Sequence, residues 1–251
     1  MNRPILIACA HGTSSVPGAA EVNALRDGIA VLRPGLDVRE AYVDVQDPGL
    51  PAVVAGLPAG ETAVVVPLLL SVGYHVKVDI ARAVRSRPDT LAAAPLGPDP
   101  RLAALLDARL REAGVTDDDA VVLAAAGSSD PSAAQNVEEL AAQLRALRPN
   151  RIVAGYGASA KPSVPEAVAA LRTADGAAGD TEGTAGRRRV VIASYLLAPG
   201  FFHDQLAKAG ADMVTAPLLP SPVLAEIALE RYDAALAMHA RPSSSRPSGG
   251  S

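Results

Sequence analysis

Two stretches of the sequence decide the fold: Ile5-Leu-Ile-Ala-Cys-Ala-His-Gly-Thr-Ser14 and Ala120-Val-Val-Leu-Ala-Ala-Ala-Gly-Ser-Ser129. Each starts with an uninterrupted apolar run, which is typical of a strand buried on both faces of a parallel sheet. Each run is then followed by a glycine, which allows a tight turn, and by two residues with hydroxyl side chains. The two stretches align with His11 opposite Ala126, so we expect the second half of the chain to repeat the first.

The segments around these stretches alternate between strand-like and helix-like patterns. Apolar residues recur at helical spacing over residues 19–32, at Val22, Leu25, Ile29 and Leu32. In the first half we expect further strands at residues 37–44, 62–69 and 91–94, and helices after Pro48, at 80–87 and at 100–112. Such alternation predicts an α/β fold of two similar Rossmann-like or flavodoxin-like domains, each a parallel sheet flanked by helices.

Further internal matches set the expected domain bounds. Leu69-Leu-Ser-Val-Gly-Tyr-His75 aligns with Leu196-Leu-Ala-Pro-Gly-Phe-Phe202, and Ala94-Pro-Leu-Gly-Pro98 aligns with Ala216-Pro-Leu-Leu-Pro220. These later matches have a larger offset than the first, which predicts an inserted loop at residues 175–188, rich in Gly, Ala, Thr and Arg. We expect domains at residues 1–116 and 117–240, followed by a disordered tail at 241–251.

The composition argues against several classes of protein. The 251-residue chain has a formal net charge of −4 and only 3% aromatic residues, which disfavours a nucleic-acid surface. No apolar run approaches the roughly 18–20 residues of a membrane span, and the N-terminus lacks a signal-peptide pattern, so we expect a cytoplasmic protein. The one cysteine, Cys9, lies within the first expected strand, where a buried inert thiol is favoured. Neither a phosphate-binding loop nor a dinucleotide fingerprint occurs, so we expect no ATP and no nucleotide.

Chemically active side chains follow three of the expected strands. His11 follows the first strand, Asp44 ends the second, and His75 follows the third. Because ligands bind beyond the carboxyl ends of parallel strands, we expect these side chains at one edge of one sheet. Two imidazoles and a carboxylate suit a divalent transition metal with an open position, or proton transfer near neutral pH. Glu40 shares a face of the second strand with Asp44 and is the alternative carboxylate.

Three motifs make the chain resemble a known family. They are Ala10-His-Gly-Thr-Ser14, Pro67-Leu-Leu-Leu-Ser-Val-Gly-Tyr-His-Val-Lys-Val-Asp-Ile80 and Tyr195-Leu-Leu-Ala-Pro-Gly-Phe-Phe-His-Asp204. Together they are similar to the sirohydrochlorin chelatases, the class II tetrapyrrole chelatases of the CbiX/SirB type, in their long two-domain form. The resemblance implies a lyase that inserts a divalent metal into sirohydrochlorin or a related tetrapyrrole without ATP. The metal would be Fe²⁺ for sirohaem, which we favour, or Co²⁺ for cobalamin.

The resemblance also implies which residues act. His11 and His75 would bind the metal, and Asp44 would complete the site or accept a pyrrole proton. The second half lacks all three groups, so we expect it to form a lid and a wall for the macrocycle. The counterparts there are Ala126, Phe202 and about Ala158.

Expected substrate contacts lie in the same motifs: Gly12, Thr13, Ser71, Gly73, Tyr74 and Lys77. The carboxylates of sirohydrochlorin make Lys77, Arg82 and Lys161 candidates to pair with it, although ordinary surface charges are the simpler interpretation. We expect His203 to face solvent, with a contact to the substrate edge as the alternative.

Two other functions stay open from the sequence. A tetrapyrrole or metal carrier would keep the fold without catalysing insertion. A phosphotransfer enzyme of the histidine phosphatase kind would also place His-Gly after its first strand, but Ala10 stands where such enzymes carry arginine. Because two fused halves can replace a symmetric dimer, the duplication is compatible with a monomer.

Overall fold

A computed structural model of the chain describes residues 3–176 and 188–240. The expected tail at 241–251 lies outside the described residues, as does the expected insertion at 175–188 except at its two ends. The first half contains β1 (Ile5–Ala10), α1 (Val16–Leu32), β2 (Val38–Tyr42), α2 (Leu50–Ala55), β3 (Ala63–Pro67), the π-helical turn η1 (His75–Ile80), α3 (Ala81–Arg85), β4 (Thr90–Ala92) and α4 (Pro100–Glu112). The second half contains β5 (Ala120–Ala125), α5 (Pro131–Leu147), β6 (Ile152–Tyr156), α6 (Val164–Gly176), β7 (Val190–Tyr195), α7 (Phe201–Leu206), β8 (Met213–Val214) and α8 (Val223–His239).

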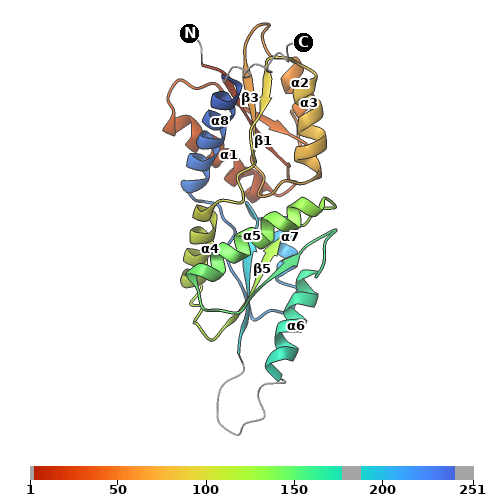
Figure 1. The fold of residues 1–251 in the computed structure, drawn as a ribbon, viewed down its shortest axis with the longest axis vertical. Coiled ribbons are helices and arrows are strands. Elements are labelled where there is room, and N and C mark those ends of the chain that lie inside the picture. The colour runs from red at the N-terminus through yellow and green to blue at the C-terminus, as the bar shows by residue number, and fades with distance from the viewer. Residues whose placement is uncertain (1–2, 177–187, 241–251) are drawn as a thin grey trace, which may run out of the picture.

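Each half is built on a four-stranded parallel sheet (Figure 1). The strand order is β2-β1-β3-β4 in the first sheet and β6-β5-β7-β8 in the second. Helices flank both sheets, and among the described residues no helix is both long and apolar enough to cross a membrane. The expected α/β fold of two similar parallel-sheet halves is therefore confirmed.

The central strand of the first sheet is buried on both faces. Every residue of β1 is buried. Alternate residues, from Leu6 to Ala10, pack into a core that includes side chains of α1 and α8, whereas those from Ile5 to Cys9 pack against α2 and α3. Because successive side chains of a strand point to opposite faces, a strand covered on both sides reads as one continuous apolar run.

The two halves repeat each other down to the backbone of the turn after the first strand. Gly12 has a φ of +98°, and a Cβ atom there would lie 2.1 Å from the carbonyl oxygen of Asp44. Gly127 has a φ of +88°, and a Cβ atom there would lie 1.9 Å from the carbonyl oxygen of Ala158. Only glycine fits either position, because any other residue would have an unfavourable φ and its Cβ atom would collide with the carbonyl oxygen. This correspondence supports the alignment of Asp44 with Ala158.

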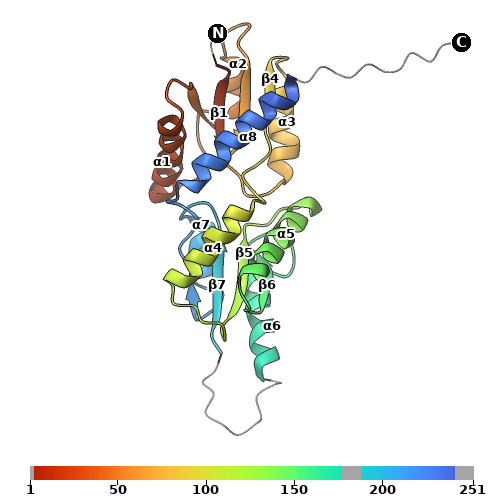
Figure 2. The same ribbon diagram turned by 60° about the vertical axis from the view of Figure 1, so that its left-hand side comes forward.

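The last helix of each half packs on the other half. α4 follows β4 but lies against α5 and β7, and α8 follows β8 but lies against α1 and β3 (Figures 1 and 2). Arg109 of α4 donates hydrogen bonds to backbone carbonyls between residues 217 and 220, and Arg231 of α8 donates to those between residues 95 and 98. A division at residue 116 therefore separates the two sheets but assigns each of these helices to the sheet that it does not cover.

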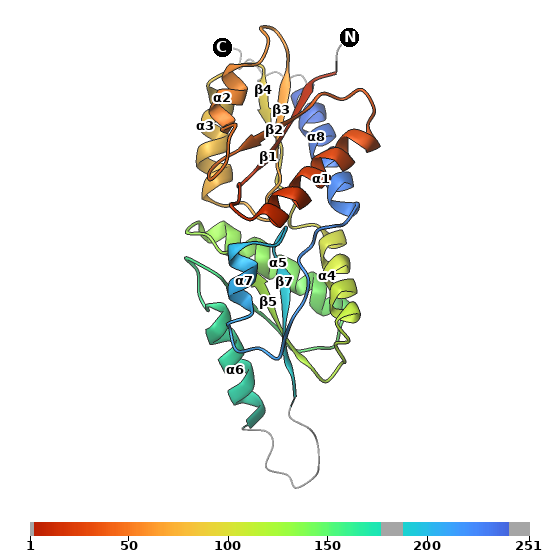
Figure 3. The ribbon, with the colours of Figure 1, turned by 180° about the vertical axis from the view of Figure 1, so that it is seen from behind.

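The carboxyl ends of the two sheets face each other across the middle of the molecule. The segments that follow β1 and β3 meet the segments that follow β5 and β7 there. From behind, α1 and α7 lie on either side of this junction (Figure 3). Any ligand that binds beyond the strand ends of one sheet would thus also contact the other sheet's loops.

Candidate metal and tetrapyrrole site

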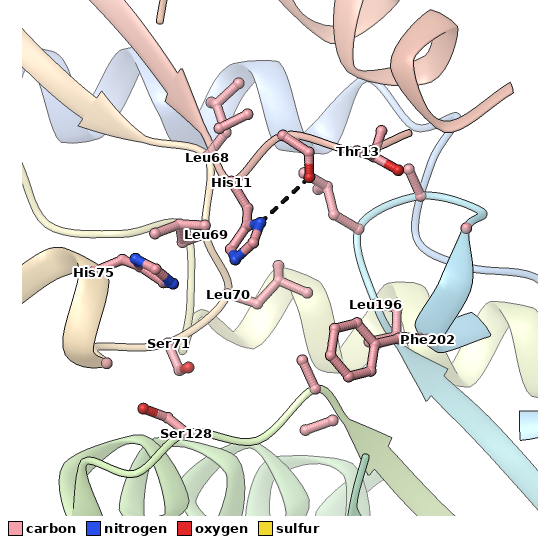
Figure 4. A pocket seen from close by; sticks show the side chains of 18 of the residues that line it. His11, Thr13, Leu68, Leu69, Leu70, Ser71, His75, Ser128, Leu196 and Phe202 are labelled. Carbon is pink, nitrogen blue, oxygen red and sulfur yellow. Dashed lines mark hydrogen bonds between the residues drawn. The ribbon is translucent and has the colours of Figure 1, made fainter. Parts of the chain in front are cut away.

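A cavity of about 460 Å³ lies between the facing ends of the two sheets. The first half contributes residues that follow β1 and β3, and the second half contributes residues that follow β5 and β7 (Figure 4). Most lining side chains are apolar, and within the described part of the chain none is Lys, Arg, Asp or Glu. Such a cavity suits a flat, largely apolar molecule whose charged groups stay at the edge.

His11 and His75 lie next to each other in the wall of this cavity (Figure 4). Their ring centroids are 4.7 Å apart and the rings are perpendicular. His11 is placed by the turn after β1, and His75 is the first residue of η1. The structure thus brings together the two residues that the sequence places at neighbouring strand ends.

Hydrogen bonds orient both imidazoles in the same way. Nδ1 of His11 is 3.3 Å from the carbonyl oxygen of Gly12, and Nδ1 of His75 is 2.8 Å from Oδ2 of Asp79. Because a carbonyl or carboxylate oxygen only accepts, Nδ1 is the donor in each pair, and in the neutral form of each ring the free lone pair is then on Nε2. Two neutral imidazoles with available Nε2 atoms are a suitable ligand pair for a divalent metal.

Two residues that support these histidines were not predicted from the sequence. Asp79 lies four residues after His75, so the i,i+4 spacing within a helical turn was the available signal. Gln46 holds the other loop, because its Oε1 accepts a hydrogen bond of 2.8 Å from the backbone N–H of Thr13. Nothing in the sequence pattern singled out Gln46.

The candidate carboxylates are not part of the cavity wall. Asp44 is exposed, and its carboxylate accepts a hydrogen bond of 2.8 Å from the backbone N–H of Val45. Glu40 is also exposed and lies 3.5 Å from Arg26. Among the described residues no cluster of three or more His, Cys, Asp or Glu side chains forms a metal site. The geometry therefore brings together two candidate protein ligands and leaves the role of Asp44 a prediction.

The family model for CbiX matches residues 5–113 and 120–235 of this chain. The chain belongs to the CbiX family. Because the model matches each half separately, it also agrees with the internal repeat. The sequence resemblance to this family is confirmed.

Individual relatives agree with this assignment. The sirohydrochlorin ferrochelatase of Priestia megaterium is 28% identical over 217 aligned positions, and the match covers 80% of this chain and 76% of the ferrochelatase. The structure of SirB from Bacillus subtilis with Fe³⁺ has a TM-score of 0.74 and 20% identity, and it covers 94% of this chain and 97% of that chain. The structure of SirB from Bacillus subtilis subspecies spizizenii in complex with cobalt has a TM-score of 0.71 and 18% identity over the same shares. These structures show that the fold is shared.

Five of the expected substrate contacts line the cavity of this CbiX member: Gly12, Thr13, Ser71, Gly73 and Tyr74. Lys77 does not, because its ammonium group forms a 2.8 Å ion pair with Asp130 of the second half. Lys161 pairs with Glu166 at the start of α6. Arg82 is exposed and lies outside the cavity wall. The simpler interpretation of these cations, as surface charges, agrees with their positions.

The second half of this CbiX member forms the opposite wall of the cavity. Phe202 stands where the alignment places the counterpart of His75, and the two residues lie on opposite sides of the cavity (Figure 4). His203 was expected to face solvent, but it is half-buried, lines the cavity, and donates from Nε2 to the carbonyl oxygen of Thr215 at 3.1 Å. This hydrogen bond explains the difference, because it holds the ring of His203 against Thr215, which directly follows β8.

Cys9 takes no part in the site. Its side chain is fully buried within β1, and burial raises the pKa of its thiol to about 12. A thiol with such a pKa is protonated at neutral pH and is neither a nucleophile nor a metal ligand.

Proposed function

We propose that this chain is a sirohydrochlorin chelatase, which inserts Fe²⁺ or Co²⁺ into the macrocycle as a substrate without ATP. The observation that carries the proposal is the pair of adjacent imidazoles, each with a free Nε2, in the wall of an apolar cavity of a CbiX-family protein. The similarity to the sirohydrochlorin ferrochelatase of Priestia megaterium supports sirohydrochlorin as the macrocycle.

The proposed reaction exchanges one set of nitrogen ligands for another. His11 and His75 hold the divalent metal as neutral ligands, and the macrocycle enters between them and Phe202. Metal–nitrogen bonds to the ring form as the bonds to Nε2 break, and two pyrrole N–H protons leave. The released imidazoles can each accept a proton, so the residues that deliver the metal also provide basic groups at the same place.

The edge of the macrocycle carries carboxylates, and the cavity offers them neutral donors. Hydroxyl groups of Thr13, Ser71 and Ser128 line it, but among the described residues no Lys or Arg does. We infer that uncharged hydrogen bonds orient the macrocycle and that most of its carboxylates stay in water. This arrangement limits the desolvation cost that buried carboxylates would otherwise incur.

Asp44 is the proposed acidic partner, with Glu40 as the alternative. The backbone N–H of Asp44 donates to the carbonyl oxygen of His11 at 3.0 Å, so Asp44 is next to the metal-binding loop. Asp44→Asn should slow insertion while leaving Co²⁺ affinity within about threefold, because the carboxylate does not line the cavity. Glu40→Gln should leave the insertion rate and the Co²⁺ affinity unchanged, since the side chain of Glu40 pairs with Arg26. If Glu40→Gln slowed insertion more than Asp44→Asn did, Glu40 would be the acidic partner instead of Asp44.

The proposal is tested by anaerobic absorbance of sirohydrochlorin mixed with Fe²⁺ or Co²⁺, comparing the wild-type protein with His11→Ala and His75→Ala. Loss of the metal-free spectrum should be faster with the wild type than without protein, and each variant should fall at least tenfold toward the uncatalysed rate. The metal with the higher rate identifies the product. Binding of the macrocycle without turnover by a folded wild-type protein would instead identify a carrier.

We also propose that the chain acts as a monomer. One chain already supplies the metal-binding wall and the opposite wall of the cavity. Sedimentation of the purified protein should give the mass of one chain, 25.5 kDa, at the concentrations used for activity. A dimer at these concentrations would refute this part of the proposal.

A further inference from the structure

The loop that carries His75 is held by side chains of the second half. Oη of Tyr195 donates a hydrogen bond of 2.7 Å to the carbonyl oxygen of Leu70. Oδ1 of Asn136 accepts one of 2.9 Å from the backbone N–H of Val72. These contacts join residues that are far apart in the sequence, and both fix backbone groups rather than side chains.

The same loop is held again immediately before His75. Oγ of Ser128 accepts a hydrogen bond of 3.5 Å from the backbone N–H of Tyr74, and a Cβ atom on Gly73 would lie only 3.0 Å from this Oγ. The carbonyl oxygen of Gly73 in turn accepts from the backbone N–H of Lys77 and so starts η1. The position of His75 thus depends on a loop whose backbone rests on the second half.

Ser128 belongs to the second half's copy of the metal-binding turn. The alignment places Ala126-Gly-Ser-Ser129 opposite His11-Gly-Thr-Ser14, so this copy has alanine in place of the imidazole. The copy nevertheless contacts the loop of the other half's second histidine, and Asn136 reaches that loop from α5, which follows the copy. The copy therefore provides no imidazole itself but supports the loop that carries His75.

We propose that Asn136 is a positioning residue of the metal site, acting together with Ser128 and Tyr195. It holds the backbone of Val72 so that His75 faces His11 at the observed ring separation of 4.7 Å. This inference rests on the proposed function, because it assumes that these two imidazoles bind the metal. Small displacements of a ligand are costly, since a bond to a metal tolerates only a few tenths of an ångström.

The test measures Co²⁺ affinity of the full chain from its visible absorption, without any tetrapyrrole. Asn136→Ala leaves the N–H of Val72 without its acceptor and should weaken Co²⁺ binding by roughly three- to tenfold, the effect of one lost hydrogen bond. Asn136→Asp keeps an acceptor oxygen and should restore affinity to within about twofold of the wild type. Gln135→Ala is the matched control, because Gln135 precedes Asn136 on α5 and is exposed.

The outcomes separate this inference from the function on which it rests. If the wild type binds Co²⁺ no better than His75→Ala, the proposed metal site itself is wrong. If the wild type binds but Asn136→Ala binds equally well, only the positioning role is wrong. Should Asn136→Ala fail to fold by circular dichroism, Tyr195→Phe removes only the hydroxyl that holds Leu70 and should weaken Co²⁺ binding in the same direction. Unchanged affinity of Tyr195→Phe would then overturn the inference.

Discussion

A carboxylate decides which nitrogen His75 offers to the cavity. Asp79 Oδ2 is 2.8 Å from Nδ1 of His75, and both side chains are only partly exposed. The carboxylate fixes the neutral tautomer with the proton on Nδ1, fixes the ring plane, and makes Nε2 a better electron donor. Among the described residues no carboxylate pairs with His11, whose Nδ1 instead donates to the carbonyl oxygen of Gly12, a weaker acceptor. We therefore expect His75 to be the more strongly binding of the two ligands.

Asp79→Ala should lower Co²⁺ affinity by about tenfold, the effect typical of removing a group that orients a metal-binding histidine. Asp79→Asn keeps an acceptor oxygen without the charge and should lie between the wild type and Asp79→Ala. Equilibrium titration followed by visible absorption gives the three affinities. Equal affinities would show that the ring of His75 is held by packing rather than by Asp79.

Residues next to strand ends were predictable from the sequence, and residues that support them were not. His11 and His75 follow apolar strands, and the rule for parallel sheets places them at one edge. Asn136 acts from a helix of the other half, and no local pattern connects it with Val72. The direction of the Asp44 side chain depends on the turn at Val45, which has a φ of +64° that apolar and polar patterns do not encode.

Among the elements, the turn between β1 and α1 is tightly constrained. Its backbone passes so close to the carbonyl of Asp44 that only glycine fits at position 12. The side chain of Gln46 then holds the N–H of Thr13. The turn that carries His11 is therefore held by its close contact with the segment after β2 and by the backbone conformation of Gly12.

Gly12→Ala should lower the free energy of unfolding by more than about 2 kcal/mol and reduce metal insertion, because it adds a collision to an unfavourable φ. Gly35→Ala is the control. Gly35 also has a positive φ, +78°, but a Cβ atom there would meet nothing within 4 Å, so it should cost only about 1 kcal/mol and leave insertion unchanged. Urea unfolding measures both costs. Equal costs would mean that the turn after β1 can move away from Asp44.

The turn before β5 depends on an ionised carboxylate. A hydrogen bond from Arg189 lowers the pKa of Asp119, burial opposes this, and hydrogen bonds from Thr116 add to the lowering. A group with a lowered pKa stabilises the folded state above its unfolded pKa, about 4, and loses this contribution as the pH falls through the folded pKa.

We therefore expect the free energy of unfolding to fall below about pH 4, and to fall less in Asp119→Asn than in the wild type. Urea unfolding at a series of pH values between about 3 and 7 measures both proteins. A constant difference between them across this range would show that Asp119 contributes only through its neutral hydrogen bonds.

Across the whole molecule, the two halves are held together by exchanged helices. The spacing of Leu102, Leu106 and Leu110 predicts that α4 is a helix with one apolar face, and the structure confirms the helix. An apolar face does not specify which sheet a helix covers. From the sequence alone, α4 is therefore assigned to the sheet of the strands that precede it. The exchange could be seen only in three dimensions, which is why domain bounds were less predictable than the elements.

A fragment of residues 1–116 should fail to fold alone, because its sheet lacks α8. Leu224, Ile227 and Leu229 of α8 are buried, and exposing such side chains costs about 2 kcal/mol each, a large share of a domain's stability. Co-expressed with residues 117–251, the fragment should co-purify as a folded complex. Circular dichroism and thermal melting check both samples. Cooperative melting of the isolated fragment would contradict the prediction.

The absence of cationic side chains from the described cavity wall has a consequence for how the substrates arrive. The chain carries a net charge of −4, so an anionic macrocycle approaches against a repulsive field while a divalent cation is attracted. Added salt screens both encounters. Ionic strength should therefore raise the association rate of one substrate and lower that of the other, and the overall rate would pass through an optimum in salt concentration.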